Sequence, residues 1–134
     1  IGDRRQRQMC IRDRCLSEMS MYSKARGANP ATFLGLAGVG DFFSTALSSD
    51  SRNYKFGEFL ADGISPESAL DKVGDTVEGY GTSLIVQQSA KDLKVDLKLL
   101  NYLISIYQEP KTLSDDKKIF HSLGIERDIN FEFK

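Results

Sequence analysis

Apolar residues recur at helical spacing through most of the chain. In residues 100–107 they fall at positions i, i+3, i+4 and i+7, and residues 56–60 show the same spacing over one turn. Alternation with a period of two occurs only at Ile129, Phe131 and Phe133, near the end. We interpret that stretch as an extended tail rather than an edge strand, because a lone strand has no partner in a helical domain. The pattern therefore predicts an all-α fold.

Capping and turn residues divide this pattern into separate helices. A helix over residues 16–26 should begin further upstream, and another should start near Thr82. The other expected helices begin at the N-cap residues Asn29, Ser51, Ser65, Asp96 and Thr112. Helices are expected to stop at Gly27, Gly63, Gly74, Pro110 and Gly124. A set of apolar residues should form the buried faces: Phe56, Phe59, Leu60, Ala69, Leu70, Val73, Val86, Ala90, Leu93, Leu100, Leu103, Ile104 and Tyr107.

Composition places the chain among ordinary globular proteins. It has 134 residues, of which 40% are hydrophobic and 28% charged, with a net charge of -1. No apolar run approaches the roughly 20 residues that a membrane-spanning helix needs, and no secretory leader is evident. Two cysteines and one histidine do not make a zinc-binding set, so we expect free thiols and no bound metal. We predict one cytoplasmic domain without a membrane partner.

The first fourteen residues differ from the rest. Five arginines gather there: Arg4, Arg5, Arg7, Arg12 and Arg14. Such an arm could bind nucleic-acid phosphates, but no aromatic residue is interleaved for base stacking and the remaining chain is acidic. Residues 5–14 also resemble translated sequencing-adapter DNA. We therefore expect residues 1–14 to be an artefactual or disordered arm, residues 15–124 a helical domain and residues 125–134 a tail, with no nucleic-acid partner.

One cluster of polar and glycine residues points to a ligand. Three glycines in residues 35–40 precede Asp41, and Ser51-Arg52-Asn53 follow at a predicted helix start. A helix N-terminus offers unpaired N–H groups and a positive dipole end to an anion, and Arg52 can add a charge-assisted contact. The cluster is compatible with a binding site for a phosphate or a polyol, which would face Asp41. A solvated cap with one surface arginine is the alternative.

A second cluster spans residues 76–82, where Glu78 lies between Val77 and Gly79. Its carboxylate could accept hydrogen bonds from ribose hydroxyls or from an amide. An ordinary first-turn glutamate, stabilised by the helix dipole, would have the same local sequence.

Taken together, these segments resemble a known family. In order they read GANPATF at 27–33, GLAGVGD at 35–41, SRN at 51–53 and VEG at 77–79. This combination is similar to the C-terminal domain of bacterial NAD(P)-dependent glycerol-3-phosphate dehydrogenases, and the similarity covers about residues 15–108, including Glu18-Met19. It implies a multi-helix domain of the 6-phosphogluconate-dehydrogenase-like type. In that family this domain packs against an N-terminal Rossmann domain, which we do not find in this sequence.

The resemblance also implies site residues. The glycerol-3-phosphate site would be lined by Asp41, Ser51, Arg52 and Asn53. The NAD or NADP cofactor would be touched by Arg52, Thr76 and Glu78, although Thr76 stands where the family usually has valine. No metal ligand is implied.

The implied reaction interconverts sn-glycerol 3-phosphate and dihydroxyacetone phosphate, and it supplies glycerol 3-phosphate for phospholipid synthesis. The general base of the family is a lysine in a K-N segment upstream of Cys15, and no lysine here matches it. We therefore expect this chain alone to be inactive. A homodimer is one possible state of the full-length protein. A non-catalytic helical module that binds an anion or another protein is the alternative.

Overall fold

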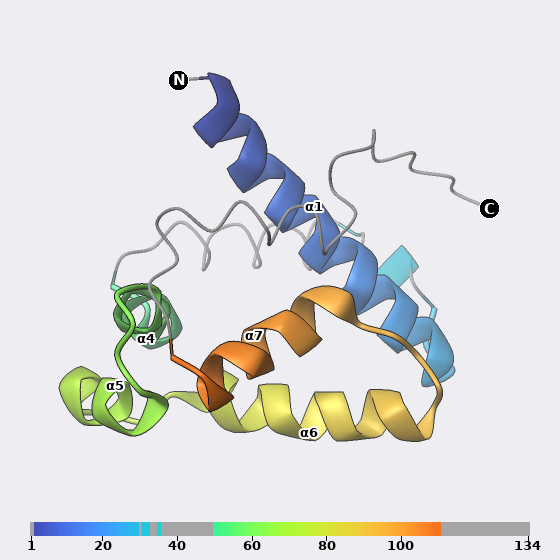
Figure 1. Ribbon diagram of the computed structural model, residues 1–134. Helices are drawn as coiled ribbons and strands as arrows, with labels where there is room; N and C mark the ends of the chain where they lie inside the picture. Colours follow the sequence, from blue (N-terminus) through green and yellow to red (C-terminus); the bar gives the residue numbers. More distant parts are fainter. Residues whose placement is uncertain (1, 30, 33–34, 36–49, 111–134) are drawn as a thin grey trace.

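The computed structural model describes residues 2–29, 31–32, 35 and 50–110. Within these residues the structure consists of α-helices joined by turns (Figure 1), which confirms the all-α prediction. They are α1 (Gly2–Ala25), α4 (Arg52–Ala61), α5 (Pro66–Val73), α6 (Glu78–Asp92) and α7 (Lys98–Gln108).

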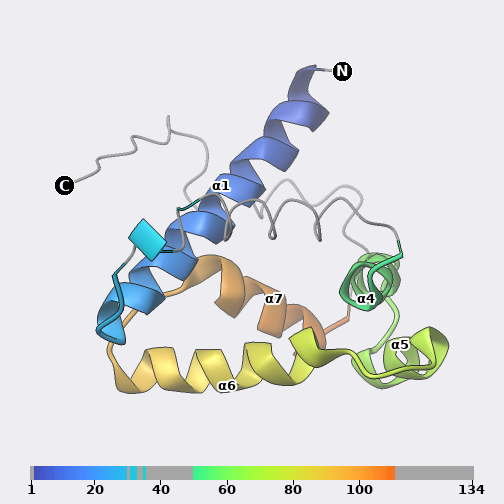
Figure 2. The same cartoon turned by 180° about the vertical axis from the view of Figure 1, so that it is seen from behind.

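Helix α7 lies between α1 and α6, and it contacts both. Helices α4 and α5 pack together at one end of α6, while the N-terminal half of α1 projects away from the other described helices (Figures 1 and 2). The Tyr22 hydroxyl donates a hydrogen bond of 3.0 Å to Ser89 Oγ and so ties α1 to α6. Helices α1, α6 and α7 thus pack side by side, and α4 lies at one end of this group.

Several helix ends follow the local sequence. Ser51 and Ser65 cap α4 and α5, because each hydroxyl oxygen accepts a backbone N–H three residues later at 3.4 Å. Asn29 Oδ1 accepts the N–H of Ala31, two residues later, at 3.0 Å. Gly27 and Gly74 end their helices with φ angles of 85° and 73°, in the left-handed region that favours glycine. The predicted boundaries at Gly27, Ser51, Ser65 and Gly74 are confirmed.

The predicted start of α6 is wrong by four residues. The helix begins at Glu78 rather than near Thr82, with Val77 as its N-cap residue. Two glycines in the first turn make the sequence look like a loop, but the N–H of Gly79 finds a side-chain acceptor on α4. A tertiary contact therefore extends the helix through residues of low helix propensity.

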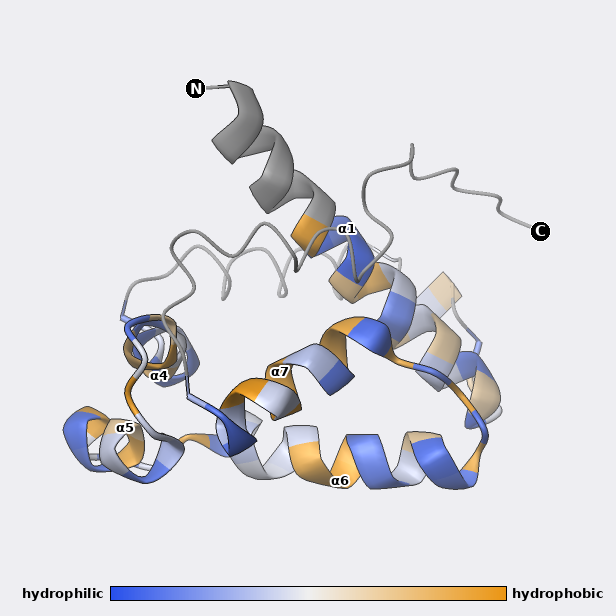
Figure 3. Cartoon of the chain, in the orientation of Figure 1, coloured by the Kyte–Doolittle hydropathy of each residue, from blue (hydrophilic) through white to orange (hydrophobic). Residues whose placement is uncertain are grey.

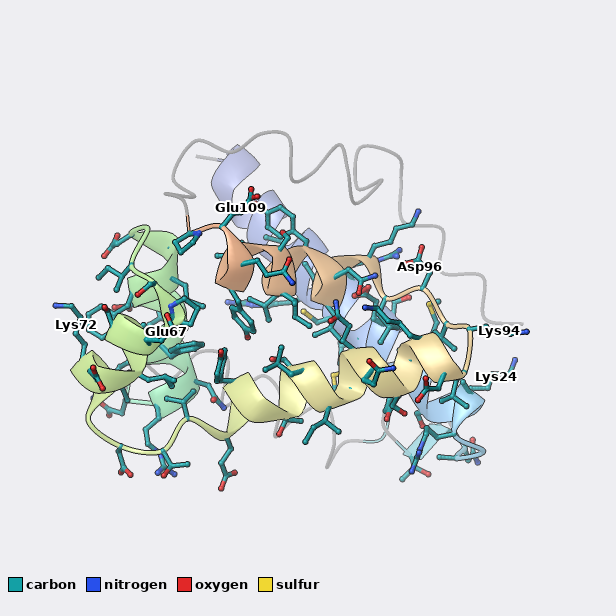
Figure 4. The ribbon with its side chains drawn as sticks, turned by 60° about the horizontal axis from the view of Figure 1, so that its bottom comes forward. Lys24, Glu67, Lys72, Lys94, Asp96 and Glu109 are labelled. Carbon is teal, nitrogen blue, oxygen red and sulfur yellow. The ribbon has the colours of Figure 1, made fainter. Side chains whose placement is uncertain are left out.

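The predicted cap of α7 is also wrong. The N-cap residue is Leu97, and Asp96 instead accepts a hydrogen bond from the side-chain amide of Asn101 at 3.3 Å. The carboxylate of Glu18, which comes from α1, accepts the N–H of Leu99 at 2.7 and 3.2 Å. Figure 4 shows Asp96 on the connection between α6 and α7, at the end of the molecule where Lys94 also lies. A residue 81 positions away therefore caps this helix.

The largest buried cluster joins α4, α5, the start of α6 and the end of α7. Its most buried members are Phe56, Leu60, Ala69, Val77 and Ile106. The rings of Phe56, Tyr80 and Tyr107 pack in edge-to-face or tilted pairs, with centroids 5.0 to 6.1 Å apart. Figure 3 shows that α7, which contacts both α1 and α6, contains apolar segments. This cluster holds the beginnings of α4 and α6 in place.

The predicted set of buried residues needs two corrections. Leu93 is 38% exposed, because it follows the last turn of α6. Ile106, outside the predicted stripe, is buried, since it packs into the cluster with Phe56, Leu60 and Ala69 of α4 and α5. Among the predicted buried residues, Phe56, Leu60, Ala69, Ala90 and Ile104 are indeed buried.

Other predictions cannot be compared with the fold. The glycine turn before Asp41, the helix over 112–124 and the tail at 125–134 lie outside the described residues. Helix α1 runs through residues 2–14, so that stretch has helical backbone where a disordered arm was one expectation. Within the described ranges, no helix combines the length and the hydropathy that crossing a membrane requires.

Candidate functional site

The site is an open pocket at the N-terminus of α4. Its volume is about 240 Å³, and its walls come from two segments that are far apart in the sequence. The lining residues are Asp50, Ser51, Arg52, Asn53, Thr76 and Glu78. The pocket thus joins the start of α4 to the turn that leads into α6.

The two walls are linked by a hydrogen bond. Asn53 Oδ1 accepts the backbone N–H of Gly79 at 3.1 Å. The approach is so close that a Cβ atom on Gly79 would stand 2.7 Å from that oxygen. Glycine at position 79 leaves room for this close approach, and the contact links the start of α4 to the start of α6.

A second link joins Arg52 to Asp75. The Arg52 Nη1 atom lies 3.3 Å from Asp75 Oδ2, and Asp75 Oδ1 accepts the N–H of Thr76 at 2.7 Å. Both charged side chains are at least half exposed. The guanidinium is therefore held at the pocket through one of its amino groups.

The chemistry of these groups suits a small anion or polyol. The start of α4 supplies backbone N–H groups with no partner inside the helix, together with the positive end of its dipole. Arg52 adds a planar set of donors, while Asp50 and Glu78 supply acceptors. Opposite charges across one pocket favour a ligand that carries both an anionic group and hydroxyls.

The pocket is too small to enclose a whole dinucleotide. Its volume falls below the roughly 300–1,000 Å³ of typical drug-sized ligand sites. The hydroxyl of Thr76 and the carboxylate of Glu78 can accept from a ribose or an amide, so they fit one part of such a cofactor. The described residues thus fit contact with a portion of NAD(P), not its complete binding.

Sequence reasoning anticipated most of this lining. Ser51, Arg52, Asn53, Thr76 and Glu78 all meet at the pocket, whereas Asp41 lies outside the described residues. Their contacts with substrate and cofactor remain predictions.

Two acidic residues were missed. Asp50 precedes the predicted cap, and Asp75 follows the glycine that ends α5. Each adjoins a recognised site residue, and that adjacency is the signal by which both could have been found.

Comparison with known proteins agrees with the all-α fold. The family described as NAD-dependent glycerol-3-phosphate dehydrogenase C-terminus matches residues 4–116. The chain belongs to this family.

Curated relatives support the same assignment. The chain is 37% identical over 118 residues to glycerol-3-phosphate dehydrogenase [NAD(P)+] of Pseudomonas paraeruginosa, with 88% of this chain and 35% of the relative covered. It is 38% identical over 120 residues to the same enzyme of Pseudomonas entomophila, covering 90% and 35%. The chain therefore spans about a third of the length of the curated relatives it matches. Comparison with solved structures finds no match.

Proposed function

We propose that this domain is the substrate-binding part of an NAD(P)-dependent oxidoreductase that interconverts sn-glycerol 3-phosphate and dihydroxyacetone phosphate. One observation carries the proposal. Residues of the SRN and VEG segments, which resemblance assigns to one active site, line one pocket at a helix N-terminus. Membership of the dehydrogenase family supports the same reaction.

The phosphate group is assigned to the start of α4. Arg52 supplies a charge-assisted contact, and the first N–H groups of the helix add donors directed at the anion. Ser51 accepts the N–H of Tyr54, which leaves its hydroxyl hydrogen to donate. Asn53 uses its oxygen on Gly79, so its amide hydrogens are the groups that can reach substrate oxygens. Asp41 is proposed to complete this site.

The cofactor is assigned mainly to another part of the full-length protein. When bound, NAD or NADP supplies or accepts the hydride exchanged with C2 of the substrate. Arg52, Thr76 and Glu78 are proposed to touch the cofactor from this side of the cleft. The general-base lysine is proposed to lie in a K-N segment upstream of the position of Cys15, as in the family, so this chain alone is expected to be inactive.

The proposal includes a cellular location and partners for the enzyme. We place it in the cytoplasm, where it provides glycerol 3-phosphate for phospholipid synthesis. Its partners are its own Rossmann domain and a second copy in a homodimer, with no nucleic acid or membrane.

The test is an assay of the full-length protein. With dihydroxyacetone phosphate and either NADH or NADPH, the expected result is loss of reduced-nicotinamide absorbance and formation of glycerol 3-phosphate. The chain of 134 residues, assayed alongside, should show no turnover. If the full-length protein bound dihydroxyacetone phosphate without turnover, the proposed dehydrogenase activity would be contradicted. The alternative, a non-catalytic binding module, would then be favoured.

A further inference from the structure

Asp75 connects the two walls of the pocket without lining it. One carboxylate oxygen accepts the N–H of Thr76 at 2.7 Å, and the other lies 3.3 Å from Arg52 Nη1. The first contact joins the carboxylate to the backbone of the turn before α6. The second reaches the first residue of α4.

The local backbone fixes where this carboxylate stands. Gly74 ends α5 in the left-handed conformation, with φ of 73°, and Val77 is buried as the N-cap residue of α6. Asp75 lies between these two anchors. Its side chain also accepts the adjacent N–H, which restricts the carboxylate more than the long arginine side chain opposite it is restricted.

We propose that Asp75 is a positioning residue, which holds the Arg52 guanidinium over the pocket for the phosphate of the substrate. This inference rests on the proposed function of the pocket. Because the ion pair engages Nη1, the remaining N–H groups of the guanidinium stay available for a bidentate contact with phosphate oxygens. The carboxylate thus lowers the entropy that Arg52 loses when substrate binds.

Stabilisation of the fold does not explain this pair. The Arg52 and Asp75 side chains are 50% and 64% exposed, and ion pairs with such exposure contribute little to the stability of a protein. An exposed contact can still set the geometry of a binding group. Asp75 is accordingly expected to change the Michaelis constant of the substrate more than the melting temperature.

The experiment is a double-mutant cycle in the full-length enzyme. The variants are Asp75→Ala, Arg52→Ala and the double variant, with Asp75→Asn as the conservative change. Asp71→Ala is the matched control, since Asp71 is an exposed aspartate on α5 that does not line the pocket. Each variant is assayed for kcat and for the KM of dihydroxyacetone phosphate, after its melting temperature has been measured.

The expected result is a rise of about two- to fivefold in KM for Asp75→Ala, with kcat little changed, as an exposed charged contact allows. Asp75→Asn should recover part of the loss, because its oxygen can still accept a hydrogen bond. In the Arg52→Ala background the same change should have no further effect. The Asp71→Ala control should match the wild type.

Three results would overturn the role of Asp75: an unchanged KM, a lowered KM, or an effect of the same size in the Arg52→Ala background. A wild-type enzyme without activity would overturn the proposed function itself. The two failures are thereby distinguished.

Discussion

The side-chain oxygen of Asn53 and the backbone N–H of Gly79 form a hydrogen bond of 3.1 Å across 26 residues of sequence. It joins the SRN segment at the start of α4 to the VEG segment at the start of α6. It also gives the N–H of Gly79 an acceptor in the first turn of α6, where the helix itself provides none. The pocket and the start of the helix thus depend on the same contact.

Replacing Gly79 with alanine should separate the two segments. The new Cβ atom would meet Asn53 Oδ1 at 2.7 Å, so either the Asn53 side chain or the start of α6 must move. We expect a higher KM for dihydroxyacetone phosphate in the full-length enzyme and a loss of stability of about 1 kcal/mol, the size of one hydrogen bond. Steady-state kinetics and urea unfolding measure the two effects.

Gly81→Ala is the matched control. A Cβ atom on Gly81, which is also in α6, would meet no other atom within 4 Å. Alanine there should be neutral or should stabilise the helix by up to about 1 kcal/mol, because glycine is a poor helix former. Equal effects of the two substitutions would contradict the role given to the Asn53–Gly79 contact.

Glu18 provides a test of how α1 supports α7. Its side chain is buried and accepts the N–H of Leu99 at the start of α7. Glu18→Ala should leave that N–H without its acceptor and destabilise the protein by about 1–3 kcal/mol, measured by urea unfolding. Glu58→Ala, at an exposed position of α4, should change the stability far less. A wild-type unfolding curve for Glu18→Ala would contradict the capping role.

The same carboxyl group predicts a pH dependence. Burial raises the pKa of Glu18 above its ordinary value of 4.5, although the N–H of Leu99 and the charge of Arg14 oppose the rise. As the pH increases from 4.5 through the raised pKa, the unfolded chain loses this proton first, so the free energy of unfolding falls. The stabilisation that comes from the proton on Glu18 is fully present below pH 4.5. It is lost as the pH rises above the pKa of Glu18 in the folded protein.

Glu18→Gln isolates this effect. Glutamine keeps an oxygen that can accept from Leu99 but does not ionise, so the variant should lose less stability than the wild type over that pH range. Urea unfolding at several pH values gives the comparison, in which all other titrating groups are shared. Parallel stability curves for the two proteins would show that the raised pKa of Glu18 does not affect folding.

The sequence predicted most of the helices because their signals are local. The Ser51 and Ser65 caps and the glycines at 27 and 74 act within one turn of their own helices. Apolar spacing likewise indicated that Phe56 and Leu60 are buried, since their positions on α4 alone decide which face is apolar.

The errors have the opposite cause. Helix α6 begins early because Asn53 supplies an acceptor, and α7 is capped by Glu18 rather than by the nearby Asp96. Both partners come from other helices, so neighbouring residues give no sign of them. Asp75 lies beside the recognised residue Thr76, but its ion pair with Arg52 is seen only in the folded chain.

The pocket was anticipated from two sources. Helix-start chemistry pointed to Ser51, Arg52 and Asn53, whereas Glu78 looked like an ordinary first-turn residue until the family resemblance connected it to them. Periodicity alone could not have joined segments that lie 26 residues apart.

The central claim is that the start of α4 binds the phosphate of the substrate, and Arg52→Ala tests it most directly. In the full-length enzyme, loss of a charge-assisted contact of about 1.5–3 kcal/mol should raise the KM of dihydroxyacetone phosphate by roughly ten- to 150-fold. Lys55→Ala, which removes an exposed positive charge one turn along α4, should leave that KM near the wild-type value. Wild-type kinetics for Arg52→Ala, or an equal loss in both variants, would contradict the assignment of the phosphate to this pocket.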